Sequence, residues 1–400
     1  MFNGQRVRLL SILVVLIVVV GYIILCILTY WTVPRPLIIN FLNACARHGL
    51  KATLDLHTYP GGSSPGTFSG VWPRWPRFWT HGDQPMDDNE NENVNADVGR
   101  NLWKEMVQWL ESLDSYTLQG LEAVSPMNEP AHLAGVFPHG KDGNPSFLPP
   151  LPNEIAEEYR RKLDSSSHDD ATLTTVPNGP HLRVLKWLDD AIDVFRNSKL
   201  PTKGIKLTVN VHESFLNPKV LPPHESDDVG GRHPGAMKVI AAWWRGVTSP
   251  IERSSWAVLD VHHYHAWESH CMGASDGHYT ANYTCSNVEE RTQALERCAG
   301  WAAVFRAAVD DECGPGALLM SGEMSASTHH SVGHACNDLS TLRATYEHQV
   351  VAAQDSNVRL YWWSYKMPYG GAFRPAWSLK QFLYLMQVLP RPDETSYGCG

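Results

Sequence analysis

Short apolar runs alternate with longer amphipathic segments from about residue 36 to the end of the chain. The first segment, 35–50, carries apolar residues at helical spacing and ends at Gly49, which predicts a helix with a glycine cap. The run "KATLDLH" at 51–57 then predicts a strand. Five further strands are predicted at 121–130, 205–215, 256–267, 316–326 and 358–367. Helical patterns lie between or after them at 99–113, 180–195, 237–247, 291–309, 342–354 and 378–389.

The predicted strands are apolar along nearly their whole length, as strands buried on both faces must be. Strands that alternate with helices indicate parallel pairing, because each helix carries the chain back to the start of the next strand. The sequence therefore predicts an α/β fold with a parallel sheet and no short internal repeat.

The N-terminal part has a different character. Residues 9–31 contain no charged side chain. This stretch is long enough for a helix to cross a bilayer. Arg6 and Arg8 precede this stretch and favour a cytoplasmic tail. We expect a tail at 1–8, a transmembrane signal anchor at 9–31 and a lumenal or extracellular domain at 32–400, as in a single-pass type II membrane protein. A secreted or cell-surface protein is the alternative.

Cysteine use agrees with an oxidising compartment. Six of the eight cysteines fall in the last third of the chain, at 271, 285, 298, 313, 336 and 399. Disulfides are expected there, although the residues alone do not fix their pairing. Asn282 begins the one clear glycosylation motif, "NYT".

The composition narrows the choice of partner. The net charge is −9 and charged residues make up 19% of the chain, so no basic surface points to nucleic acid. The chain contains 15 tryptophans, whose flat faces pack in cores and also stack on sugars.

Polar and aromatic residues gather where the predicted strands end. They are His57; Asn128 and Glu129; His212 and Glu213; His262 and Tyr264; Glu323; and Trp362 and Trp363. A buried carboxylate is costly unless it is paired or used, and Pro130 stops its strand directly after Glu129. Such a set at the carboxyl ends of parallel strands is typical of the active site of a (β/α) barrel.

At this point the chain resembles glycoside hydrolase family 5, and within it the branch of exo-β-1,3-glucanases. The resemblance is carried, in the family's order, by "DLHTYPGG" (55–62), "MNEP" (127–130), "VHESF" (211–215), "DVHHYHAW" (260–267), "SGEMS" (321–325), "YWWSYK" (361–366), "WSL" (377–379) and "CG" (399–400). It implies a retaining hydrolase of β-glucan, with β-1,3-glucan expected, that needs no cofactor and no metal.

The resemblance also implies a role for each site residue. Glu129 is the expected general acid/base and Glu323 the expected nucleophile. The expected sugar-binding residues are His57, Asn128, His262, Tyr264 and Trp363. Retaining hydrolysis needs two carboxyl groups about 5–5.5 Å apart, one protonated and one ionised, so we predict a raised pKa for Glu129 and a lowered one for Glu323.

Two further expectations concern the edges of this site. Trp72, Trp75, Phe78 and Trp79 are candidates for a stacking rim, the alternative being a loop folded on its own side chains. From the family's terminal Cys-Gly, the resemblance implies a disulfide between Cys399 and Cys298.

The family's first two strands, and the arginine that ends the second, have no counterpart after residue 32. We therefore expect an incomplete TIM-type (β/α)8 barrel of six recognisable strands, with residues 9–31 helical and a gap between the first and last of those strands. The sugar subsite should be open on the arginine side, and weak or no activity is expected.

Two alternatives of other classes stay open. One is a non-catalytic barrel relative that binds glucan or a partner protein. The other is a metal hydrolase built on "HHYHAWESHC" at 262–271, which the spacing disfavours because His262 and His263 point to opposite faces of a strand. Turnover of an aryl β-glucoside that survives chelation separates the hydrolase from both.

Overall fold

The structure of the protein is a computed structural model. It describes residues 16–17, 33–59, 78, 94–130, 151–164, 180–211, 234–268, 271–331, 333–365 and 373–388.

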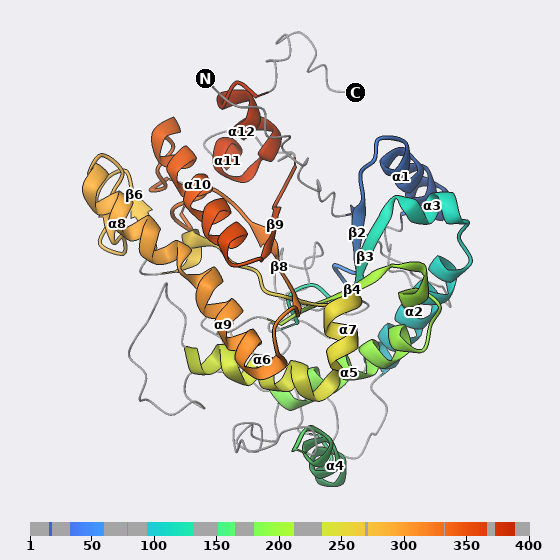
Figure 1. The fold of residues 1–400 in the computed structure, drawn as a ribbon. Helices are drawn as coiled ribbons and strands as arrows, with labels where there is room; N and C mark the ends of the chain where they lie inside the picture. The colour runs from blue at the N-terminus through green and yellow to red at the C-terminus, as the bar shows by residue number, and fades with distance from the viewer. Residues whose placement is uncertain are drawn as a thin grey trace. The chain divides into compact units, whose positions relative to one another are not determined.

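The chain forms a seven-stranded sheet, part of which is labelled in Figure 1. In spatial order its strands are β1 (Leu16–Ile17), β2 (Ala52–Asp55), β3 (Leu121–Ser125), β4 (Lys206–Asn210), β5 (Ala257–Asp260), β8 (Leu318–Met324) and β9 (Arg359–Trp362). Each neighbouring pair from β1 to β8 is parallel. All six predicted strands are confirmed, in chain order and with helices between them, which is the βα order expected of a partial (β/α) barrel.

Strand β1 lies inside the stretch expected to be a membrane helix. Leu16 and Ile17 are extended and pair with Leu54 and Asp55 of β2, so at these two positions the structure differs from the prediction. Apolar residues of this kind suit a strand as well as a helix, and the pairing gives β2 a second neighbour besides β3. The rest of 9–31 lies outside the described residues. Within the described part of the chain, no helix combines the length and apolarity that a bilayer crossing needs.

The chain divides into two compact units. Unit 1 comprises residues 1–226, 233–261 and 307–320, and unit 2 comprises residues 227–232, 262–306 and 321–400. Strand β8 therefore starts in unit 1, where it pairs with β5, and ends in unit 2.

Unit 1 holds helices α1 (Arg35–Arg47), α2 (Val94–Glu111), α3 (Ser115–Gln119), α4 (Asn153–Asp164), α5 (Pro180–Arg196), α6 (Pro234–Val247) and α7 (Pro250–Ser255), the 3-10 turn η2 (Pro201–Lys203), and the second half of α9 (Trp301–Cys313). Local sequence sets several of their starts. The Asp114 carboxylate accepts a hydrogen bond from the Thr117 amide at the start of α3. Ser249 and Glu252 form a reciprocal capping box on α7.

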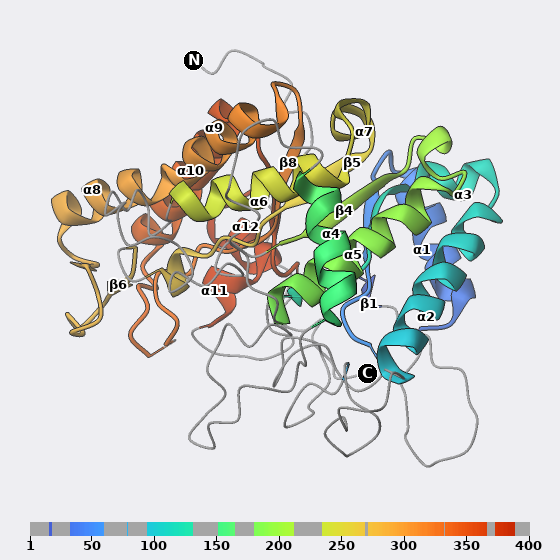
Figure 2. The ribbon, with the colours of Figure 1, turned by 90° about the horizontal axis from the view of Figure 1, so that it is seen from below.

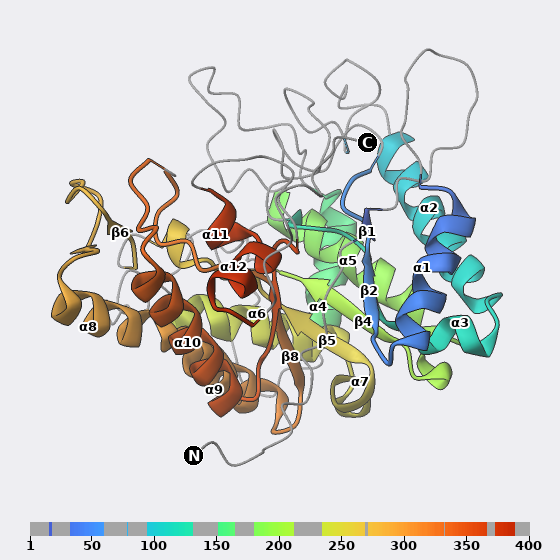
Figure 3. The ribbon, with the colours of Figure 1, turned by 90° about the horizontal axis from the view of Figure 1, so that it is seen from above.

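Close approaches fix these helices on the sheet. Helices α1 and α3 lie side by side next to β2 (Figure 3), where Gly120 sits against the Leu42 carbonyl with no room for a Cβ atom. Figure 2 shows α2 next to α5 and α4 next to α6. The Trp103 indole donates to the Ala191 carbonyl at 2.9 Å, and the Trp243 indole donates to the Tyr159 hydroxyl at 2.9 Å.

One aromatic residue expected at the rim of the cleft is buried in unit 1. Phe78 is fully buried and packs edge-on against Tyr59 and Trp187, with ring centroids 5.2 and 5.6 Å away. The prediction of a stacking role is wrong for Phe78, because its ring faces other side chains and not solvent. Trp72, Trp75 and Trp79 lie outside the described residues.

Unit 2 holds the end of β8, β9, the short strands β6 (Gly273–Ala274) and β7 (Tyr283–Thr284), the turn η4 (His265–Trp267), and helices α8 (Val288–Ala299), α10 (Leu339–Asp355), α11 (Phe373–Trp377) and α12 (Leu379–Leu385), with the first half of α9. Helices α10, α11 and α12 gather around β9 (Figure 1). Their shared core contains Tyr264, Met324, Leu342, Trp362, Trp377 and Phe382.

Two disulfides cross-link unit 2. Cys271 pairs with Cys298, and Cys285 pairs with Cys336, each with 5.6 Å between Cα atoms. The prediction that Cys298 pairs with Cys399 is therefore wrong, because Cys298 on α8 already has a partner. Cys399 lies outside the described residues.

Candidate active site

In unit 1, the end of β2 presents His57. Its Nδ1 lies 2.7 Å from Oδ2 of Asp55, and its Nε2 lies 3.4 Å from Nδ2 of Asn128. An ionised Asp55 accepts, so Nδ1 carries the proton and Nε2 is left to accept from the Asn128 amide. This relay fixes both the imidazole and the amide, and the backbone N–H of Asn128 also donates to the Leu56 carbonyl at 3.3 Å.

Glu129 follows Asn128 in an unusual backbone conformation. Its φ is +41°, in the left-handed region that non-glycine residues rarely adopt. The residue is partly buried. Backbone strain of this kind persists where the surroundings over-determine it, and it clusters at functional sites.

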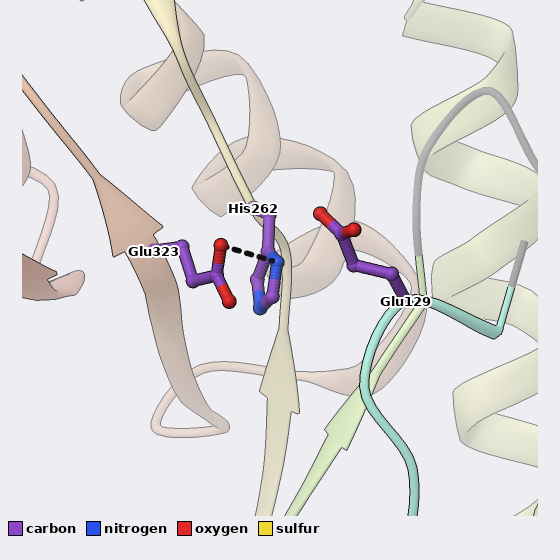
Figure 4. Close-up of side chains that lie close together, drawn as sticks. All are labelled: Glu129, His262 and Glu323. Carbon is purple, nitrogen blue, oxygen red and sulfur yellow. Dashed lines mark ion pairs between the residues drawn. The ribbon is translucent and has the colours of Figure 1, made fainter. Parts of the chain in front are cut away.

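In unit 2, Glu323 near the end of β8 is buried and held by two side chains. The Tyr264 hydroxyl donates to its Oε2 at 2.5 Å, and Nδ1 of His262 lies 3.6 Å from the same oxygen. Figure 4 shows the pairing of His262 with Glu323 and labels Glu129, which follows β3. A hydrogen bond from Tyr264 favours the ionised carboxylate, which is the form that a nucleophile requires.

The backbone around Glu323 is also fixed. Its carbonyl accepts from the His263 amide at 3.2 Å and from the Ser321 hydroxyl at 3.0 Å. The chain after β5 is thus hydrogen-bonded to the end of β8. These bonds fix the backbone position from which the Glu323 side chain extends.

Trp363 lies directly after β9 and is half-buried. Its amide donates to the Met324 carbonyl at 2.9 Å, and its ring meets that of Trp377 edge-on with centroids 5.5 Å apart. Trp377 also contacts Tyr264, at 5.3 Å between centroids. Trp363 is therefore braced against the aromatic group that supports Tyr264.

The predicted site residues divide between the units. His57, Asn128 and Glu129 lie together in unit 1, whereas His262, Tyr264, Glu323 and Trp363 lie together in unit 2. His212 and Glu213 lie outside the described residues. The predicted pKa difference between the two acids stays a prediction.

Sequence reasoning missed two supporting residues. Asp55 orients His57, and its place two residues earlier on the same strand face was the available signal. Trp377 packs against Tyr264 and Trp363, and its place in the "WSL" motif was the available signal.

Two residues of the segment considered for an alternative metal site, 262–271, are engaged elsewhere. Cys271 is disulfide-bonded, and His263 is stacked on Trp301 with ring centroids 4.6 Å apart. Neither offers an accessible ligand atom beside His262.

A separate pocket of about 430 Å³ lies between α2 and α5 of unit 1. Its walls include Trp103 and Trp187, with Arg100, Lys104 and Asp190 among the polar residues. It contains none of the predicted site residues.

No family model and no curated protein matches this chain. Solved structures show distant similarity. A rutinosidase from Aspergillus niger is 13% identical, with a TM-score of 0.43 over 85% of this chain and 68% of that one. A broad-specificity GH5-4 endoglucanase from Bacteroides salanitronis is 14% identical, with a TM-score of 0.38 over 85% and 70%. A GH53 catalytic domain from Ignisphaera aggregans is 11% identical, with a TM-score of 0.32 over 83% and 79%. These similarities are too distant to assign an activity.

Proposed function

We propose that this protein is a retaining glycoside hydrolase of β-glucan, with β-1,3-glucan as the expected substrate. The observation that carries the proposal is Glu323, a buried carboxylate held by Tyr264 and His262 near the carboxyl end of a parallel strand. Burying a carboxylate is costly unless donors stabilise its charge. A buried carboxylate held by such donors is suited to nucleophilic attack.

The second acid of the proposal is Glu129. It follows β3, and β3 is joined to β8 through the parallel ladders of β4 and β5. The carboxyl ends of parallel strands lie at one edge of a sheet, which supports Glu129 and Glu323 as a pair. The proposed chemistry requires about 5–5.5 Å between the two carboxyl groups.

The reaction would proceed by double displacement. Glu129 gives its proton to the glycosidic oxygen while an oxygen of Glu323 attacks the anomeric carbon, so the glycosidic bond breaks and a glycosyl ester forms. Glu129, now ionised, takes a proton from water, and the water oxygen displaces Glu323 from the anomeric carbon. In this proposal Asn128, which is hydrogen-bonded to His57, binds the sugar 2-hydroxyl, and Trp363 lies beneath the sugar ring.

Two substitutions test the proposal. Glu129→Gln and Glu323→Gln should each lower turnover of an aryl β-glucoside and of a laminarin-type glucan by several orders of magnitude, since each removes a group that acts in the transition state. Glu289→Gln, on the exposed first turn of α8, is the matched control and should keep wild-type turnover.

A mechanism-based probe locates the nucleophile directly. A 2-deoxy-2-fluoro glucoside should accumulate as a covalent ester, and peptide mass mapping should place the label on Glu323. Full turnover by either glutamine variant, or a label on another residue, contradicts the assignment. Glucan binding without any turnover would favour the non-catalytic alternative.

A further inference from the structure

Four histidines in unit 2 lie in contact with one another, apart from the site described above. His278 stands in the segment before β7, and His329, His330 and His334 stand in the segment that follows β8. Ring centroids are 4.2 Å apart for His278 and His334, 4.4 Å for His329 and His330, and 5.5 Å for His278 and His329. Of these rings, His329 is the most deeply buried, with 1% of its surface exposed.

Backbone amides fix the protonation of two of these rings. The Ser331 N–H donates to Nδ1 of His329 at 2.9 Å, and the Thr280 N–H donates to Nδ1 of His278 at 3.4 Å. Because an amide can only donate, both Nδ1 atoms must be unprotonated. Nε2 of His329 then donates to the Thr280 hydroxyl at 3.0 Å, and that hydroxyl donates to Nδ1 of His278 at 2.8 Å.

The same hydrogen bonds argue against a preformed metal site on this pair. A neutral imidazole with an unprotonated Nδ1 carries its proton on Nε2, so neither Nε2 offers a lone pair. Moving the proton to Nδ1 would set it against a backbone N–H.

Within the described residues, the titratable groups in and beside this histidine cluster come from two segments. Asp276 and His278 belong to the segment before β7, and His330 and His334 belong to the segment after β8. Asp276 is engaged by Nδ1 of His334 at 2.7 Å. The other titratable neighbours in the described part of the chain are imidazoles, which carry no negative charge that could stabilise a proton on His329.

These two segments are also joined through their backbones. The Gly273 amide donates to the Thr328 carbonyl at 2.8 Å, and the Ser275 amide donates to the His334 carbonyl at 2.8 Å. The later segment continues from β8, so Thr328 follows the nucleophile candidate Glu323 by only a few residues.

We propose that His329 and His278 form an acid-sensitive latch, which holds residues 325–331 and 333–337 against residues 272–284 while both rings are neutral and loosens this contact when His329 is protonated. Protonation puts a hydrogen on Nδ1 of His329, which breaks its bond with the Ser331 amide and adds a positive charge among three imidazoles. Any effect on hydrolysis rests on the proposed function, whereas the latch itself does not.

The direction of the pH response follows from burial. Burial lowers the pKa of His329, and repulsion from protonated His330, His278 and His334 lowers it further. The open segment, with an ordinary histidine pKa of about 6.5, therefore takes up the proton first. The latch is at full strength above about pH 6.5 and weakens as the pH falls. The ratio of closed to open segment falls by up to about tenfold for each unit by which the closed state lowers the pKa of His329.

Hydrogen exchange of the disulfide-intact protein, without substrate, tests the latch. After correction for intrinsic rates, amides of 325–337 should exchange at least severalfold faster at pH 5.5 than at pH 7.5. His329→Asn keeps an acceptor near the Nδ1 position and cannot be protonated, so its exchange should not change with pH. His348→Asn, a half-buried histidine on α10 outside the cluster, should respond as wild type does.

Equal wild-type protection at both pH values, or an unchanged response in His329→Asn, overturns the proposal. Should that variant not fold, the wild-type protein still decides the question. Long-range ¹⁵N–¹H spectra of its imidazoles at pH 7.5 should show His329 protonated at Nε2 and not at Nδ1, and the opposite tautomer overturns the proposal. Because no substrate is used, failure here is separate from failure of the hydrolase assignment.

Discussion

At the scale of single residues, the Glu323 carboxylate depends on its neighbours for its charge. The Tyr264 hydroxyl donates to it at 2.5 Å, and a hydrogen bond to a charged group contributes about 1.5–3 kcal/mol. The His262 ring approaches the same oxygen but more loosely. Tyr264 is therefore the residue whose loss should most directly affect the proposed nucleophile.

We predict that Tyr264→Phe lowers kcat/KM for an aryl β-glucoside by about 10- to 100-fold, because about 1.4 kcal/mol corresponds to a factor of ten. The acid limb of the pH–rate profile should move to higher pH, since the ionised carboxylate has lost a donor. Steady-state rates between pH 4 and 8 give both quantities.

Tyr346→Phe is the control, because Tyr346 packs at the edge of the same core against Trp362 and Phe382. It should keep both the rate and the profile. A Tyr264→Phe enzyme with a wild-type profile would show that Tyr264 only fills space.

The sequence was most informative about residues at strand ends. His57, Asn128, Tyr264 and Glu323 were predicted because parallel strands bring their carboxyl ends to one edge. Asp55 was missed, because its one signal, a place two residues before His57 on the same strand face, does not by itself show that the two side chains are bonded. Phe78 was misjudged for a similar reason, since an aromatic residue in a loop looks the same whether it faces solvent or Trp187.

At the scale of elements, the six strands could be predicted because each is apolar on both faces and bounded by polar or glycine-rich segments. Strand β1 could not be predicted from the sequence. An uncharged stretch of more than 20 residues fits a membrane helix by length, and nothing in the sequence next to Leu16 and Ile17 indicates that these two residues pair with β2.

The contact of α1 with α3 gives an element-scale prediction. A Cβ atom on Gly120 would lie 2.0 Å from the Leu42 carbonyl oxygen, and a helix backbone cannot yield as a flexible side chain can. Gly120→Ala should therefore force α3 away from α1 and lower the free energy of unfolding by about 1–3 kcal/mol. Urea unfolding followed by circular dichroism measures it.

Gly333→Ala is the matched control, because a Cβ atom there meets nothing within 4 Å. Its effect should stay within about 0.5 kcal/mol. Equal stability of the two variants would mean that α1 and α3 are not in firm contact.

At the scale of the whole molecule, the disulfide pairing was the feature that sequence could not supply. Six cysteines allow 15 pairings, and the choice depends on which sulfur atoms the fold brings together. Cys298 meets Cys271 because α8 packs beside the segment before β6, a contact between residues 27 positions apart that no local pattern encodes.

The two bridges close loops of 27 and 51 residues, and their ranges overlap. Loop closure of this size is worth about 3.5–4 kcal/mol for each bridge in the chain-entropy account. Within the described residues both bridges belong to unit 2, and neither includes Cys45 or Cys313 of unit 1.

Overlap of the bridged ranges means that one proteolytic cut anywhere from Cys271 to Cys336 releases no fragment. A cut before Cys298 is spanned by the first bridge, and a cut after Cys285 is spanned by the second. Protein nicked in this stretch should run as one band on a non-reducing gel and as two after reduction, and two bands without reductant would contradict the pairing. A protease would thus have to cut this part of the protein more than once to release a piece of it.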